Sequence, residues 1–166
     1  MDFLYYQRKI NDVIEKCPIE TGVEILVYNL LDKCVDSNNF SLVDINSIWK
    51  NQDIRLTTDG GISDIAILST DFKFGEEDKG NVYGFVEVKP SRVTLTDSEQ
   101  VSKQMKKVNH YIYTNGIVWK YFLNQTLKWE INLSNGEFSY AIKKIYINES
   151  KFTELKNALQ KIEWST

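Results

Sequence analysis

The feature that most constrains the fold is a β-favouring run that carries charges at one end. Residues 82–89, VYGFVEVK, are mostly apolar, β-branched or aromatic, which is typical of a buried strand. Glu87 and Lys89 are two residues apart, so they project from the same face of that strand, and Pro90 ends the run. A sheet that buries this strand must therefore provide a partner for the Glu87 carboxylate.

A second apolar run, residues 62–68, precedes the first and predicts the other strand of a long hairpin. The connection between the two runs is polar and rich in Asp, Glu, Lys and Gly. Asp64 interrupts the second run, and pairing of the two strands would bring it toward Glu87 and Lys89. Buried carboxylates that converge need a cation or an ammonium group to neutralise them.

These three residues allow two interpretations. In the first, Asp64 and Glu87 bind a metal ion, and the absence of a Cys or His cluster favours Mg²⁺ or Mn²⁺ over Zn²⁺. In the second, Asp64 marks a strand end, and Glu87 and Lys89 form an ordinary ion pair on an exposed surface.

Apolar residues recur at helical spacing in four segments. Cys17-Pro18 interrupts the first pattern, and a polar cluster at residues 36–39 ends the second. Thr96-Asp97-Ser98-Glu99 has the spacing of a capping box and predicts the start of the third helix. The patterns predict helices over residues 2–16, about 19–35, 97 to about 113, and after Ser150.

Further short β-favouring runs predict more strands. Residues 117–123 and 126–133 are joined by Asn124-Gln125, which indicates a tight hairpin. The remaining predicted strands are residues 53–57, 137–140 and 144–147. This order of elements predicts a mixed α/β (α+β) fold, in which helices flank a central mixed sheet and extra strands and a helix follow at the C-terminus.

Composition excludes several classes of protein. With 166 residues, 42% of them apolar, the chain is long enough for one domain with a hydrophobic core. No apolar run approaches the roughly 18 residues that a membrane-spanning helix needs, and we find no secretion signal at Met1. Cys17 and Cys34 are too few for a disulfide scaffold and are expected to be buried thiols. We therefore expect a cytoplasmic protein that does not bind a membrane.

The charges are distributed unevenly along the chain. Residues 1–89 carry 16 acidic and 9 basic side chains, whereas residues 90–166 carry 7 acidic and 11 basic ones. An acidic half can gather carboxylates around a cation and a basic half can face a polyanion, although solvated surface alone also produces such a split.

Two sequence blocks carry a resemblance to a known family. Gly61–Ile67 (GISDIAI) and Gly84–Pro90 (GFVEVKP) resemble the D…ExK core of the PD-(D/E)xK nuclease superfamily. Gln104 and Tyr113–Tyr121 (YTNGIVWKY) resemble the N-terminal nuclease domain of type I restriction enzyme motor subunits and their small single-domain relatives. The similarity spans about Glu20 to Leu123. Ser63 stands where the family has its Pro, and Val108 stands where the restriction subunits often have Tyr.

The resemblance implies one restriction-endonuclease-like domain over residues 1–166, with a core at about 19–133. It implies that Asp64, Glu87 and the Val88 carbonyl bind Mg²⁺ or Mn²⁺, and that Lys89 positions or activates the attacking water. It also implies that Gln104 orients substrate or water, and that a Glu on the first core helix reaches the metal. Glu24 lies on the apolar stripe of that helix and is preferred to Glu20, which is in its first turn.

A basic stripe follows Gln104. Lys103, Lys106, Lys107 and His110 recur at helical spacing on the predicted helix over residues 97–113. The three lysines are candidate nucleic-acid contacts that neutralise phosphates, and the alternative is a solvated helix face. We read the four tryptophans and nine tyrosines as core or half-buried strand residues rather than a base-stacking platform.

These observations favour a metal-dependent endonuclease that hydrolyses phosphodiester bonds, with DNA as the expected polymer. A homodimer or a partner subunit could supply its specificity. Two alternatives stay open: a catalytically silent nuclease fold that binds nucleic acid or a protein, and a nuclease that acts on RNA or single strands.

Overall fold

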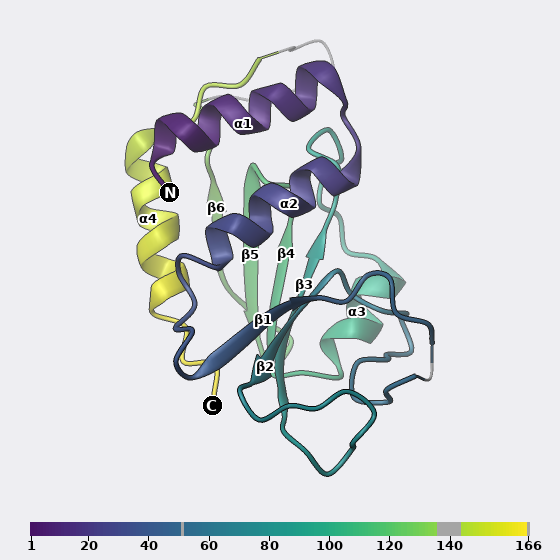
Figure 1. Cartoon of the computed structure of the whole chain (residues 1–166). Coiled ribbons are helices and arrows are strands. Elements are labelled where there is room, and N and C mark those ends of the chain that lie inside the picture. The colour runs from purple at the N-terminus through teal and green to yellow at the C-terminus, as the bar shows by residue number, and fades with distance from the viewer. Residues whose placement is uncertain (51, 136–143, 166) are drawn as a thin grey trace.

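In the described part of the chain, six strands form one mixed sheet at the centre of the protein (Figure 1). The structure, a computed structural model, describes residues 1–50, 52–135 and 144–165. The strands lie in chain order, and their bounds are β1 Phe40–Asp44, β2 Ile65–Ser69, β3 Val82–Val88, β4 His110–Thr114, β5 Val118–Leu123 and β6 Thr126–Asn132. Neighbouring strands are antiparallel except β3 and β4, which are parallel.

One face of the sheet is covered by three helices (Figure 1). They are α1 (Phe3–Lys16), α2 (Glu20–Leu31) and α4 (Glu149–Gln160). Their apolar stripes pack on the sheet residues Val86, Ile112 and Trp119 in one core cluster. The Tyr6 hydroxyl of α1 also donates to the carbonyl of Gly116 at 2.6 Å, which ties this helix to the turn between β4 and β5.

The opposite face has a smaller core. Alternate residues of the strands, among them Phe85, Tyr111 and Phe122, pack there against Val101 of α3 (Glu99–Met105). The period of two along a strand explains this division, since Phe85 faces α3 while Val86 faces α2. At the end of β3, Val86 and Val88 therefore face the helices α1, α2 and α4, whereas Glu87 faces the side of the sheet that carries α3.

Most of the predicted elements are confirmed. Helices occur at residues 3–16, 20–31 and 149–160, and the hairpin of residues 62–68 and 82–89 is the β2–β3 pair. Asn124 and Gln125 form the two-residue turn between β5 and β6, with φ values of 50° and 63°. Positive φ angles at both central residues are typical of a two-residue type I′ hairpin turn, whose twist matches the right-handed twist of the flanking strands. Asn148, rather than Ser150, caps α4 through a bond from the amide of Lys151.

The predicted helix over residues 97–113 is wrong beyond Met105. Ser98 caps α3 by accepting from the Val101 amide, and the helix lasts only seven residues. Residues 110–114 form β4, a central strand that is buried along its whole length between β3 and β5. The apolar spacing predicted one continuous helix, but its residues belong to two different cores. Val101 and Val108 lie in the core on the α3 face of the sheet, whereas Ile112 lies in the core on the other face.

The predicted strand at residues 53–57 is also wrong. These residues form turns, because the Asp53 side chain accepts from the backbone amides of Arg55 and Gly75. The Arg55 guanidinium binds Asp53 at 2.6 Å and donates to the Lys73 carbonyl at 2.7 Å. It also lies 3.9 Å from the centre of the Phe72 ring. This buried pair holds the long β2–β3 connection against the chain segment before β2.

Three smaller differences concern the chain ends and the cysteines. Residues 144–147 form no strand, and a single bridge joins Ser134 to Ile147. The predicted strand at 137–140 lies outside the described residues. Cys34 is buried as expected, but Cys17, at the end of α1, is exposed.

None of the helices in the described part of the chain is long and apolar enough to cross a membrane.

The aromatic residues also divide. Trp119 and Trp164 are fully buried, as expected for core residues, whereas Trp49 is 77% exposed in the segment between β1 and β2.

We predict that Asp53→Asn lowers the free energy of unfolding by about 3 kcal/mol at neutral pH, because it leaves a buried guanidinium without its counterion. The Arg55 hydrogen bonds hold the pKa of Asp53 at about 2, below its ordinary 3.8. The stabilisation is thus complete above about pH 4 and is lost as the pH falls toward 2. Chemical denaturation of both proteins across this range measures it. Asp12→Asn, in the exposed pair with Lys16, is the control and should change little.

Candidate active site

Glu87 is the centre of a polar cluster buried at the end of β3. The residue is 2% exposed and lies on the face of the sheet that carries α3. Its Oε1 accepts from Lys89 Nζ at 2.6 Å and from Gln100 Nε2 at 3.1 Å. Its Oε2 accepts from Gln104 Nε2 at 2.9 Å. The carboxylate is therefore held by one ammonium group and two side-chain amides.

Gln104 joins this cluster to the next strand. Its Oε1 accepts from the Tyr111 hydroxyl at 2.5 Å while its Nε2 binds Glu87, so both ends of the amide are used. Gly60 presses on the helix at this point, and a Cβ there would collide with the carbonyl oxygen of Gln100. This close packing and the two hydrogen bonds fix the position of Gln104, which is fully buried.

Asp64 directly precedes β2 and faces the end of β3. Its Oδ2 accepts from the backbone amide of Val88 at 2.6 Å. Val88 directly follows Glu87 on β3, so this bond brings the Asp64 carboxylate near Glu87. Burial, and then the charge of Glu87, raise the pKa of Asp64 to about 8, with smaller contributions from Glu24 and Glu20. The Val88 amide acts in the opposite direction but does not offset them.

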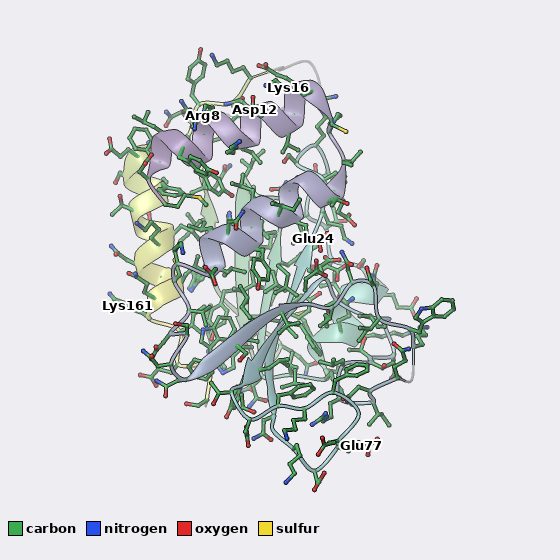
Figure 2. All side chains as sticks on the ribbon, in the orientation of Figure 1. Arg8, Asp12, Lys16, Glu24, Glu77 and Lys161 are labelled. Atoms are coloured by element: carbon green, nitrogen blue, oxygen red, sulfur yellow. The ribbon has the colours of Figure 1, made fainter. Side chains whose placement is uncertain are left out.

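Glu24 reaches the same region from the other face. It lies on the side of α2 that is turned toward the sheet (Figure 2) and is 5% exposed. Asn46 Nδ2 donates to its Oε1 at 2.5 Å. Burial, and then the charge of Asp44, raise its pKa. Glu20 is half-buried, and its charge also acts on Asp64.

Lys89 is the ammonium group of the cluster. Burial alone would lower its pKa, but the hydrogen bond to Glu87 and the charges of Glu87, Glu20 and Asp64 outweigh burial and raise it. Lys89 therefore stays protonated, and its charge balances that of the Glu87 carboxylate, which it contacts at 2.6 Å.

The donor set suits a hard divalent ion. Asp64, Glu87 and the Val88 carbonyl are oxygen donors at one end of the β2–β3 hairpin, which matches the preference of Mg²⁺ and Mn²⁺. Burial and the charge of Glu87 raise the pKa of Asp64, so a cation beside Asp64 would favour its ionised form. Among the residues that the structure describes, no three or more Asp, Glu, His or Cys side chains are grouped so that they could hold a metal. Asp64, Glu87 and a backbone oxygen were expected as ligands together with a Glu of the first core helix, and the structure does not group Glu24 with Asp64 and Glu87 as a third acidic ligand.

Comparison with solved structures identifies a similar fold. A chain of the DrdV–DNA complex, determined by cryo-electron microscopy, matches with a TM-score of 0.60 and 12% sequence identity, over 95% of this chain and 94% of that one. No family model and no curated protein matches the sequence. The expected fold class, a restriction-endonuclease-like mixed sheet flanked by helices, is confirmed.

The predicted basic stripe is only partly present. Lys103 pairs with Glu99 at 2.6 Å on α3, and Lys106 and Lys107 are exposed at and just after the end of that helix. His110 does not belong to the stripe, because it is 1% exposed in β4 and its Nδ1 lies 2.8 Å from the Tyr121 hydroxyl. The ring of His110 also packs 5.4 Å from that of Trp164.

Three residues of the cluster were missed by the sequence analysis: Gln100, Tyr111 and Asn46. Gln100 lies four residues before Gln104, and this helical spacing could have identified it. Tyr111 and Asn46 come from a strand and a loop whose contacts no local pattern reveals.

We predict that Asp64→Asn raises the melting temperature of the metal-free protein by about 2–4 °C, the shift that about 1 kcal/mol produces at this chain length. The amide still accepts from Val88 but cannot ionise, so the variant has neither the cost of burying a charge nor the repulsion by Glu87 that together raise the pKa of Asp64. Differential scanning calorimetry measures the change. The same variant should lose any stabilisation by millimolar Mg²⁺ or Mn²⁺.

The control for this prediction is Asp71→Asn, at an exposed carboxylate in the β2–β3 connection. This variant should keep the wild-type response to metal. An equal rise in melting temperature with metal in Asp64→Asn and in wild type would contradict the assignment of Asp64 as a ligand.

Proposed function

We propose that this protein is a metal-dependent nuclease that hydrolyses phosphodiester bonds in DNA. The observation that carries the proposal is the buried Glu87 carboxylate, which is bound by Lys89 and lies beside the carboxylate of Asp64. Buried acids and a cation in contact are costly to maintain for stability alone. Groups with strongly perturbed pKa values that converge on one point are typical of catalytic sites.

Asp64, Glu87 and the Val88 carbonyl would hold the divalent ion. When bound, the ion would shield the charge of the phosphodiester and lower the pKa of the attacking water. The chain's own contribution is rigidity, since Glu87 is held by Gln100 and Gln104, and Asp64 is held by the Val88 amide. Such preorganised groups stabilise developing charge without rearranging during the reaction.

Lys89 and Glu24 would have separate roles. The Lys89 ammonium, held on Glu87 at 2.6 Å, would orient the attacking water and stabilise negative charge on the phosphoryl oxygens. Glu24 enters from α2 on the opposite side of β3 and would bind the ion through a water molecule. Gln104 is a positioning residue, because it acts through Glu87 and Tyr111.

Two observations support DNA as the polymer. The matching solved chain is part of a complex with DNA. Lys106 and Lys107 follow the helix that carries Gln100 and Gln104, so they can meet phosphates near the cluster.

We predict that Glu87→Gln and Lys89→Met each reduce the rate of DNA cleavage at least about 100-fold, the usual effect of removing a group that assists proton transfer or charge stabilisation. Cleavage of labelled single-stranded, duplex and branched DNA and of RNA, with Mg²⁺ or Mn²⁺ and with a chelator, measures the effect. Circular dichroism establishes that each variant folds.

The matched controls are Glu154→Gln and Lys151→Met. These residues form an exposed ion pair at 2.8 Å on α4, on the other face of the sheet, and both variants should cleave at the wild-type rate. If the wild-type protein binds DNA but cleaves no polymer with either metal, the nuclease proposal fails in favour of a binding module. If the protein cleaves RNA but not DNA, RNA rather than DNA is the substrate of this site.

We also predict that the double variant Lys106→Ala, Lys107→Ala weakens DNA binding and reduces its salt dependence. The slope of log K against log salt for duplex DNA falls by about 0.9 for each phosphate that the protein no longer neutralises, so a fall of about 1.8 is expected. Fluorescence anisotropy at several salt concentrations measures the slope. Lys151→Ala with Lys161→Ala on and beside α4 is the control, and an unchanged slope in the α3 variant would show that those two lysines are merely solvated.

A further inference from the structure

A cavity of about 340 Å³, lined by both polar and apolar side chains, lies beside the Glu87 cluster and shares none of its residues. One wall is the segment that follows Pro90, and the other is formed by β5 and β6. The lining residues that matter here are Ser91, Arg92, Val93, Val118, Lys120 and Glu130. Its volume is within the range of sites that hold small molecules.

The strand register connects this cavity to the Glu87 cluster. Glu87, Tyr113, Lys120 and Glu130 lie directly opposite one another on β3, β4, β5 and β6. Side chains in such a cross-strand row point to the same face of the sheet. Since neighbouring strands are about 4.8 Å apart, the backbone of Lys120 is about 10 Å from that of Glu87. The row therefore leads from the cluster into the cavity.

Two buried polar atoms of residues that line the cavity form no hydrogen bond in the described part of the chain. Ser91 is 4% exposed, and neither its Oγ nor the buried Nε of Arg92 has a partner among the described residues. The Arg92 Nη2 donates to the Ile14 carbonyl at 3.1 Å, which fixes the guanidinium in place. Buried polar groups without partners are costly, so a small shift of the wall that brings these two atoms to a polar occupant would be favourable.

The lining chemistry indicates what that occupant is. Arg92 and Lys120 supply positive charge, and the contacts of Lys120 are long: 3.4 Å to Glu130 and 3.4 Å to the Leu95 carbonyl. The ammonium can therefore exchange them for a shorter, stronger contact with a phosphate. Val93 and Val118 add apolar surface that suits the plane of a base.

We propose that this cavity binds a nucleotide of the substrate strand, next to the bond that is cleaved. Its phosphate contacts Arg92 and Lys120, and its base lies against Val93 and Val118. The inference rests on the proposed nuclease function and adds a subsite that fixes the strand relative to Glu87. Glu130 limits the affinity, because its carboxylate competes with the phosphate for Lys120.

Binding of thymidine 3′,5′-bisphosphate to the full-length ¹⁵N-labelled protein tests the proposal without any need for cleavage. We expect the largest amide shifts at residues 91–95 and 118–120. Lys120→Met should weaken binding at least threefold, and Glu130→Gln should strengthen it. Lys128→Met, at an exposed lysine of β6 outside the cavity, is the matched control and should bind as wild type does.

Shifts that map elsewhere, or an equal dissociation constant in wild type and Lys120→Met, would overturn the proposal. Inorganic phosphate and thymidine, titrated separately, should each bind more weakly than the bisphosphate, and equal binding of inorganic phosphate would also overturn it. A protein that binds the bisphosphate in this cavity but cleaves no polymer would retain the nucleotide site and lose the proposed nuclease function. If the protein cleaves DNA but does not bind the bisphosphate in this cavity, the proposed nuclease function is retained and the nucleotide site is lost.

Discussion

The structure depends on the burial of one carboxylate. Glu87 is almost inaccessible, and a charge in that position is tolerable only because Lys89, Gln100 and Gln104 all donate to it. This requirement fixes the direction of α3 against β3, and through Tyr111 it extends to β4. The positions of these elements and the chemistry of the site therefore have the same physical cause.

The core is divided into two clusters, one on each face of the sheet, and the charged residues lie at the end of the central strand β3. Helices α1, α2 and α4 cover one face of the sheet and bring Glu24 to it, while α3 covers the other face and brings the two glutamines. Asp64 lies where β2 begins, held by the Val88 amide of β3. Burial, and then the charges of these acidic groups acting on one another, raise the pKa values of Asp64 and Glu24, an effect that a cation would offset.

Strand periodicity predicted the part of the site that lies on the β2–β3 hairpin. Glu87 and Lys89 share a face because they are two residues apart, and the β2–β3 hairpin brings Asp64 to them. Periodicity failed at residues 106–114, where an apolar pattern fits both a helix and a strand, and only pairing of β4 with β3 and β5 decides between them. Asn46 and the Asp53–Arg55 pair act through contacts distant in sequence, which local pattern cannot reveal.

The most direct test of the proposed metal site is a crystal structure of the protein with Mn²⁺, collected at a wavelength where manganese scatters anomalously. The account predicts an anomalous peak within about 2–2.5 Å of oxygens from Asp64 and Glu87, with the Val88 carbonyl also in the coordination sphere. An occupied Mn²⁺ position elsewhere, with Lys89 still bound to Glu87 and no peak between the two carboxylates, would contradict it.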